Sequence, residues 1–208
     1  MWKILIPKFF HISKSTYKKS SLEKNLTKRK LKFPIVIKPV NEGSSLGVRI
    51  VKNFRDLKKF TSDLFKKYDQ LICEQYIGGQ EIQASVINDK PLGAIELIPK
   101  RNFYDYKAKY TKSAKTKHIM PARLEKKKYL EVLNLAKLAH QALGCKGVTR
   151  SDFKFYKNKF FLLETNTQPG MTNLSLVPEI ANYYKLNFND LVETILLDAS
   201  LNRWIKDL

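Results

Sequence analysis

The sequence predicts an α+β fold whose sheets are mostly antiparallel. Apolar runs about the length of single strands recur along the 208 residues and are separated by turn residues. A few longer stretches instead place apolar side chains at helical spacing. Strands and helices mixed in this way indicate an α+β chain.

The predicted strands are short apolar runs that end at polar or glycine-containing turns. Gly78-Gly79 and the run 88–91 are the clearest of these turns. The strands are expected at residues 9–12, 33–40, 48–51, 70–77, 81–87 and 92–99, with a further hairpin within 149–176.

The predicted helices are defined by their apolar stripes and their end signals. Asn53 is a suitable N-cap for a helix that runs to about Lys67, and Gly144 is a stop signal for a helix over 129–143. Residues 13–32 favour a solvated amphipathic helix or a partly mobile segment. Two more helices are expected near the end of the chain, at 178–184 and 189–197.

The formal net charge of +20 comes from 39 Lys and Arg against 19 Asp and Glu. Such a charge ordinarily suggests nucleic acid or an anionic membrane surface as a partner. The excess is confined to two segments, since residues 1–32 and 100–128 each carry a net +9. Lysines also outnumber arginines by 32 to 7, whereas bidentate recognition of phosphate favours arginine. A nucleic-acid-binding module is therefore the weakest of the interpretations kept below.

Cys73 and Cys145 lack the spacing of a metal site or a disulfide scaffold, so we expect reduced structural thiols. The start of the chain is too short and too interrupted for a signal-peptide core. No run approaches the roughly 20 apolar residues of a membrane span. We therefore expect a cytoplasmic protein.

A Gly/Ser-rich loop that follows a lysine is the first candidate site. Lys38 lies near the end of the apolar strand 33–40, and the loop Asn41–Gly47 comes next. Backbone N–H groups and small hydroxyls in such a loop can hold phosphate oxygens. No GK[ST] closes the loop, so it is not a Walker A sequence, and an ordinary hairpin turn remains the alternative.

Residues 100–121 form a long stretch without a clear period, in which aromatic residues interleave with lysines. Loops of this length are usually lids or disordered segments. Its lysines and tyrosines can close over a polyphosphate. Single-stranded nucleic acid also favours this mixture, and that alternative stays open.

Two carboxylates on the expected hairpin form the second candidate site. If Tyr156 pairs with Phe160 across a three-residue loop, Asp152 lies opposite Glu164. Like charges placed directly opposite repel each other, so a cation between them would explain the pair. Carboxylate and amide oxygens suit Mg²⁺, and Asn166 shares the face of Glu164. A surface hairpin with scattered charges remains the alternative.

The same residues carry a resemblance to a known family. R-x-D at Arg150–Asp152 is followed by L-L-E-x-N-x-x-P-G-M-T, which ends at Thr172. The two motifs resemble the carboxy-terminal part of the ATP-grasp ligases, and within them the D-alanine–D-alanine ligases. The similarity spans nearly the whole chain from Phe33 onward. It implies an ATP-grasp fold in which two α+β subdomains, 1–74 and 75–208, grip ATP between their sheets.

The resemblance implies nucleotide contacts in the first half of the chain. Lys38 matches the strand lysine that contacts the nucleotide phosphates, and Ser44 matches the loop position tied to closure over the substrate. The family's adenine contacts match Glu74, Tyr76 and Ile77, and its ribose contact matches Glu81.

The loop 100–121 resembles the family's lid. In that resemblance Lys109 would reach the γ-phosphate, and Tyr104 and Tyr110 would help to seal the site. Tyr110 also matches the tyrosine that accompanies D-alanine rather than D-lactate as the acceptor.

The resemblance places the chemistry on the hairpin and the turn after it. Arg150 matches the arginine that steadies the transferring phosphate, and the N–H of Gly170 matches the oxyanion donor. The family's magnesium ligands match Asp152, Glu164 and Asn166, and its contacts to the carboxylate of the second D-alanine match Ser175 and Leu176.

The implied activity is the ATP-dependent joining of two D-alanines for peptidoglycan precursor synthesis. ATP would convert one carboxylate into an acyl phosphate, which the amine of the second D-alanine attacks, so that ADP and phosphate are released. Two Mg²⁺ or Mn²⁺ ions together with Lys38, Lys109 and Arg150 would neutralise the phosphates. Members of the family are usually homodimers.

One part of the family has no match in these residues. Its amino-terminal domain supplies an acidic residue and a histidine that position the first D-alanine. Gln168 also stands where the family has a small hydroxyl residue. Three interpretations therefore stay open: a ligase, a catalytically incomplete remnant or split-gene half that binds Mg·ATP only or needs a separately encoded amino-terminal partner, and a nucleic-acid-binding module.

Overall fold

The computed structural model describes residues 3–43, 45–99, 116–172 and 174–199, which form two compact units. Residues 6–78, with Pro99 and Thr116, form the four-stranded unit, and residues 3–5, 79–98 and 117–199 form the five-stranded unit. The predicted division into 1–74 and 75–208 stays a prediction. Within the described ranges, no helix combines the length and the apolar character that crossing a membrane requires.

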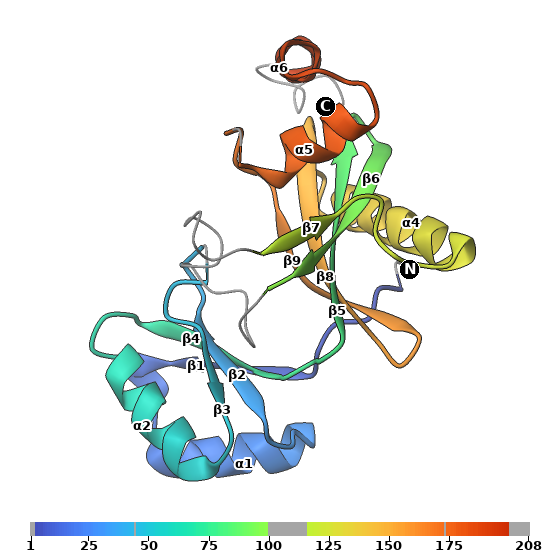
Figure 1. The fold of residues 1–208 in the computed structure, drawn as a ribbon. Coiled ribbons are helices and arrows are strands. Elements are labelled where there is room, and N and C mark those ends of the chain that lie inside the picture. Colours follow the sequence, from blue (N-terminus) through green and yellow to red (C-terminus); the bar gives the residue numbers. More distant parts are fainter. Residues whose placement is uncertain (1–2, 44, 100–115, 173, 200–208) are drawn as a thin grey trace. The chain divides into compact units, whose positions relative to one another are not determined.

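The four-stranded unit is an antiparallel sheet with the strand order β1-β4-β2-β3 and two helices beside it (Figure 1). The predicted N-cap is confirmed, because Asn53 Oδ1 accepts a hydrogen bond from Asp56 N at 2.9 Å. The elements are β1 (Phe9–Ser13), the 3₁₀ turn η1 (Lys14–Thr16), α1 (Lys19–Arg29), β2 (Ile35–Pro39), β3 (Arg49–Val51), α2 (Phe54–Leu64) and β4 (Gln70–Gln75).

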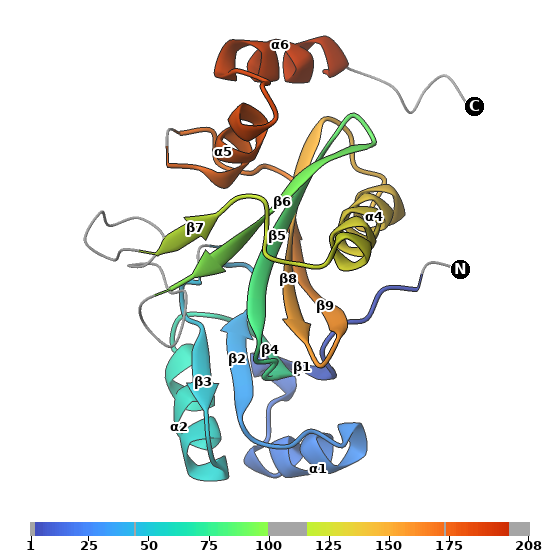
Figure 2. The ribbon, with the colours of Figure 1, turned by 45° about the vertical axis from the view of Figure 1, so that its right-hand side comes forward.

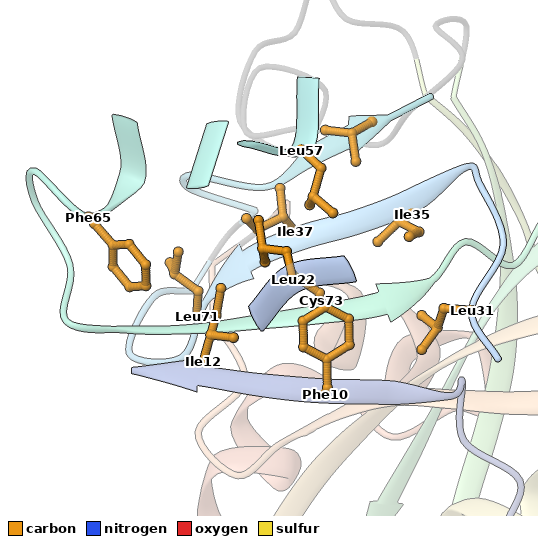
Figure 3. Packing of buried hydrophobic residues seen from close by; sticks show 11 residues of the cluster. Phe10, Ile12, Leu22, Leu31, Ile35, Ile37, Leu57, Phe65, Leu71 and Cys73 are labelled. Carbon is orange, nitrogen blue, oxygen red and sulfur yellow. The ribbon is translucent and has the colours of Figure 1, made fainter. Parts of the chain in front are cut away.

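One face of this sheet is apolar and packs against both helices (Figure 3). Leu22 of α1 and Leu57 of α2 are fully buried there, together with Ile37 of β2. The burial of Leu22 shows that α1 is amphipathic and anchored by its apolar stripe. Because strand side chains alternate faces, Lys38 and Glu74 belong to the opposite face. The unit thus keeps the charged residues of its two central strands away from its core.

The five-stranded unit is also antiparallel throughout its described strand pairs, with the order β7-β6-β5-β8-β9. Its elements are β5 (Gln80–Ile87), β6 (Lys90–Ile98), β7 (Lys117–Ile119), α4 (Lys126–Ala142), β8 (Val148–Tyr156), β9 (Lys159–Asn166), α5 (Leu176–Tyr183) and α6 (Phe188–Asp198). The α+β fold class predicted from the sequence is confirmed in both units.

The two faces of the five-stranded sheet are covered by different helices (Figure 2). α4 packs on the face that carries Ile82 and Phe153. α5 packs on the other face, where Val177 joins a cluster with Ile87 and Val148. Side chains two residues apart on a strand share a face, so the charged residues of β8 (Arg150, Asp152 and Lys154) lie on the side of the sheet that α5 covers in part.

One predicted loop is partly wrong. Residues 117–119, assigned from the sequence to the long loop 100–121, form β7 and pair with β6. Three residues are too few for the period of a strand to be recognised, and this strand is stabilised by pairing with the edge of an existing sheet. Residues 100–115 of the predicted loop lie outside the described residues.

The loop of the β8–β9 hairpin has two residues instead of the predicted three. Tyr156 pairs with Lys159 and not with Phe160. The two loop residues, Lys157 and Asn158, have φ values of 48° and 61°. Positive φ at both positions is the signature of a type I′ turn, which matches the twist of the flanking strands.

A β-bulge then restores the pairing that the sequence predicted. With a two-residue loop and regular pairing, Asp152 would lie opposite Leu163. The register shifts by one residue between Asp152 and Phe153, so that Leu163 is the extra residue and Glu164 pairs with Asp152. The predicted juxtaposition of the two carboxylates is confirmed, although the pairing reaches it by a different route.

Gly79 directly precedes β5 and allows the start of this strand to approach β8 closely. Its φ is +86°, and a Cβ atom at this position would overlap the carbonyl oxygen of Phe155. A residue with a side chain would therefore meet both an unfavourable backbone conformation and a steric clash.

We expect Gly79→Ala to lower the free energy of unfolding by roughly 2 kcal/mol, because L-residues pay about this much in strained positive-φ conformations. Urea unfolding measures the change. Gly43→Ala is the matched control, since nothing lies within 4 Å of a Cβ built there. Equal stability of the two variants would show that Gly79 carries no constraint.

His140 connects α4 to the start of β8. The side chain is 1% exposed, and its Nδ1 is hydrogen bonded to Thr149 Oγ1 at 2.9 Å. Burial lowers the pKa of His140 below its ordinary value, and the Asp89 carboxylate opposes this effect only in part. The folded chain therefore favours the neutral imidazole more than the unfolded chain does.

We expect the stability that depends on His140 to be complete above the ordinary histidine pKa of about 6.5 and to fall as the pH decreases below it. Replacing His140 by Gln should flatten the dependence of unfolding free energy on pH between about 7 and 5, by at most about 1.4 kcal/mol per pH unit. Urea unfolding at several pH values tests this, with the exposed His11 replaced by Gln as the control. Parallel pH profiles for the wild-type chain and His140→Gln would contradict the assignment.

Candidate functional site

A charged face lies on one side of the five-stranded sheet, along β8 and its two neighbours. Directly paired residues of antiparallel strands place their side chains on the same face. Polar side chains of β5 and β9 therefore lie on this face, on either side of those of β8. The pairs across β5 and β8 are Glu81 with Lys154, Gln83 with Asp152 and Ser85 with Arg150, and those across β8 and β9 are Asp152 with Glu164 and Arg150 with Asn166.

Arg150 holds both oxygens of the Asp152 carboxylate. Its Nε donates to Oδ1 at 2.8 Å, and its Nη2 donates to Oδ2 at 3.2 Å. The two side chains are only 14% and 9% exposed. Bidentate pairs of this kind are charge-assisted and fix the orientation of the carboxylate as well as its charge.

Glu164 lies opposite Asp152 but has a different environment. Its side chain is exposed, and it makes no ion pair or hydrogen bond within the part of the chain that the structure describes. Asn166, two residues further on, accepts a hydrogen bond from Gln168 N on its Oδ1 at 3.1 Å. One carboxylate of the pair is thus neutralised by Arg150 and the other is not.

The donor set fits a hard divalent cation. Two carboxylates and one amide oxygen are ligands that suit Mg²⁺ or Mn²⁺. No cluster of three or more His, Cys, Asp and Glu side chains suited to a metal occurs among the described residues. A cation here would therefore depend on Asn166 and on oxygens from water or a substrate, which is how Mg²⁺ is usually held.

The turn between β9 and α5 is closed by Ser175. Thr172 N donates to Ser175 Oγ at 3.0 Å, and the two hydroxyls are hydrogen bonded at 2.9 Å. A Cβ atom on Gly170 would lie 2.8 Å from the same Oγ. Leu176, the first residue of α5, is buried at 6% exposure. The predicted residues of this segment, Gly170, Ser175 and Leu176, are thus brought into one short turn.

Lys38 and Glu74 form an ion pair in the four-stranded unit. Lys38 Nζ lies 3.0 Å from Glu74 Oε1, and the side chains are 20% and 12% exposed. Cys73 precedes Glu74 on β4, and burial, followed by the neighbouring Glu74 charge, raises the pKa of its thiol to about 12. Both cysteines are free, and Cys73 is held as an unreactive thiol beside this pair.

The other predicted nucleotide residues of this unit lie at or beyond the end of β4. Tyr76 donates its backbone N–H to Pro34 O at 3.3 Å, and Ile77 follows it after the strand has ended. Four predicted site residues lie outside the described residues: Ser44, Tyr104, Lys109 and Tyr110.

Sequence reasoning assigned no role to two residues of the charged face. Lys154 donates from Nζ to Glu81 Oε2 at 2.9 Å. Gln83 is fully buried, and neither polar atom of its side chain has a hydrogen-bond partner in the part of the chain that the structure describes, although buried amides are normally paired. Lys154 shares its face with Arg150 and Asp152, and Gln83 shares its face with Glu81. Their spacing of two residues from predicted site residues on the same strand is the signal that identifies them.

Comparison with known proteins identifies the family. A sequence model for the family described as "D-ala D-ala ligase C-terminus" matches residues 2–197. This chain belongs to the D-alanine–D-alanine ligase family. The D-alanine–D-alanine ligase of Pelagibacter ubique (strain HTCC1062) is 52% identical over 202 residues, which cover 97% of this chain and 65% of that protein.

Solved structures of the D-alanine–D-alanine ligase family share the fold. A Bacillus anthracis D-alanine–D-alanine ligase in complex with ATP has a TM-score of 0.76 at 28% identity, over 94% of this chain and 61% of that one. The VanG D-Ala:D-Ser ligase of Enterococcus faecalis has a TM-score of 0.80 at 27% identity, over 93% and 56%. The chain thus spans less than two thirds of the length of each of these relatives.

We expect Gly170→Ala to displace Ser175 Oγ and so to break its hydrogen bonds to Thr172, at a cost of about 1 kcal/mol in unfolding free energy. Ser175→Ala should cost a similar amount for the same reason. The double variant should then cost no more than the larger single change, which a double-mutant cycle in urea measures. Additive losses would show that the two residues do not act on one contact.

Proposed function

We propose that this chain is the nucleotide-binding and metal-binding part of an ATP-dependent ligase that joins two D-alanines. The observation that carries the proposal is the charged face, where Arg150 orients Asp152 directly opposite Glu164, which has no side-chain partner among the described residues. The family, the fold of its solved members and the closed turn after β9 all support it. In this proposal ATP and D-alanine are the substrates.

The reaction requires activation of a carboxylate. A carboxylate is a poor acyl donor because it is anionic and would have to expel oxide. Transfer of the γ-phosphoryl group of ATP to a carboxylate oxygen gives an acyl phosphate and ADP. The amine of the second D-alanine then attacks the carbonyl carbon, the carbon–oxygen bond to phosphate breaks, and the amine loses a proton to give the dipeptide.

The charged face supplies the groups that this chemistry needs. Asp152, Glu164 and Asn166 would hold the metal, which when bound neutralises phosphate charge. Arg150 has further donors beyond the two that bind Asp152, and these would stabilise the transferring phosphoryl group. Lys38 of the other unit would bind phosphate oxygens as a point charge. Positioning and charge neutralisation are the main sources of rate in phosphoryl transfer.

The turn after β9 supplies the acceptor contacts in this proposal. The N–H of Gly170 would donate to the developing oxyanion, a contact typically worth roughly 3–4 kcal/mol. Ser175 and the start of α5 at Leu176 would receive the carboxylate of the second amino acid. The family includes a D-Ala:D-Ser ligase, so the acceptor is the part of the proposal that depends most on residues such as Tyr110.

A second candidate function is binding of Mg·ATP without ligation. The chain covers 65% of the length of the Pelagibacter ubique ligase, and the resemblance assigns the contacts to the first D-alanine to a domain that these 208 residues do not match. In this proposal ligation needs the contacts of that domain, whereas binding of Mg·ATP does not. Formation of a homodimer, as is usual in the family, is likewise part of the proposal.

We expect Mg·ATP to raise the melting temperature of the chain, because a ligand that binds only the folded state stabilises it by mass action. Asp152→Asn or Glu164→Gln should abolish most of this shift by removing a metal ligand. Differential scanning fluorimetry with ATP, with and without Mg²⁺, measures the effect.

Glu131→Gln, which changes an exposed carboxylate of α4, is the matched control and should keep the full shift. An unchanged shift in both site variants would reject the metal assignment. Release of phosphate that depends on D-alanine distinguishes a ligase from a chain that only binds the nucleotide.

A further inference from the structure

Lys154 lies at one end of the charged face, two residues along β8 from Asp152, and nothing in the family resemblance gives it a role. Its Nζ donates to Glu81 Oε2 at 2.9 Å, and the side chains of Lys154 and Glu81 are 17% and 14% exposed. The two residues are direct partners across β5 and β8. The ion pair is therefore fixed by the backbone register of the sheet as well as by the side chains.

We propose that Lys154 is a positioning residue that orients Glu81 toward the ribose of ATP. This inference rests on the proposed function, in which Glu81 accepts hydrogen bonds from the ribose hydroxyls. Lys154 occupies Oε2, whereas Oε1 accepts no hydrogen bond from the described residues. A carboxylate fixed at one oxygen presents the other in a defined direction, so less entropy is lost when a hydroxyl binds.

Stability alone does not account for this pair. Taking two charges out of water carries a desolvation penalty that their attraction only roughly offsets, and apolar replacements of buried ion pairs are often as stable. The pair also lies on the face that carries Arg150 and Asp152, and Lys154 is two residues along β8 from Asp152. Both facts favour a role in presenting Glu81 to a ligand over a role in holding the sheet together.

Two other roles for Lys154 give different results with a modified nucleotide. If Lys154 contacts phosphate directly, its loss weakens every nucleotide triphosphate equally. If it serves only the fold, its loss lowers the stability of the free chain and affects all ligands alike. A positioning role through Glu81 instead predicts a loss that depends on the ribose hydroxyls.

The experiment compares Mg·ATP with Mg·2′,3′-dideoxy-ATP, which lacks both ribose hydroxyls. Lys154→Met keeps the length of the side chain without its charge. We expect this variant to bind Mg·ATP about tenfold more weakly and Mg·2′,3′-dideoxy-ATP less than twofold more weakly than the wild-type chain, by isothermal titration calorimetry. Glu81→Gln should show the same pattern, and the double variant should lose no more than the larger single change.

Two further variants act as controls. Lys128→Met removes a lysine of α4 that pairs with Glu131 at 2.7 Å and is likewise 17% exposed, and it should leave both affinities unchanged. Lys154→Arg keeps a charged donor and should recover most of the lost ATP affinity. If Lys154→Met does not fold, binding of the two nucleotides is compared in the double variant instead, because that variant removes both buried charges.

Each outcome decides between the hypotheses. A selective loss for the nucleotide with ribose hydroxyls supports the positioning role. An equal loss for both nucleotides, or no loss for either, overturns it while the proposed function stands. If the wild-type chain binds Mg·ATP in neither calorimetry nor fluorimetry, the proposed function fails and this inference fails with it.

Discussion

The register of β8 determines where the charges of the charged face lie. β8 pairs with β5 on one side and with β9 on the other, so residues two apart on it meet partners on both neighbours. A slip of one residue would turn the whole set toward the face that packs against α4, where Phe153 is fully buried. Gly79 at one end of the pairing and the β-bulge beside Asp152 fix this register.

The energetics of the charged face indicate function more than stability. Four charged side chains of this face are less than a fifth exposed: Arg150, Asp152, Lys154 and Glu81. Burial has therefore removed most of the water that would hydrate their charges. Buried ion pairs seldom repay that cost in stability relative to apolar side chains. Charges that are already desolvated and already oriented can, however, stabilise charge in a ligand without reorganising. A sheet face built for stability alone would resemble the face under α4, which packs Ile82 and Phe153.

The sequence predicted the helices, the strands other than β7, and the two carboxylates, because each rests on local periodicity. It could not predict the turn and the bulge that together place Asp152 opposite Glu164. The type I′ turn contains no glycine, only Lys157 and Asn158 at positive φ, and the bulge at Asp152 depends on pairing with a partner strand rather than on local sequence. The ion pairs from Lys38 to Glu74 and from Lys154 to Glu81 join residues far apart in the chain, so no local pattern could reveal them.

Each unit holds a partly buried pair of opposite charges. In the four-stranded unit Lys38 and Glu74 neutralise each other on the face opposite the helices, and in the five-stranded unit Arg150 neutralises Asp152. A charged ligand group that binds there can join an existing ion pair or replace one of its members. The free-energy cost is lower than that of desolvating a charge that has no partner. Glu164 is the exception, because it is exposed and has no partner within the described ranges. Because Arg150 already holds both oxygens of Asp152, Glu164 is the carboxylate that would gain most from a cation in the proposed function. Its position opposite Asp152 would let one cation bind both carboxylates.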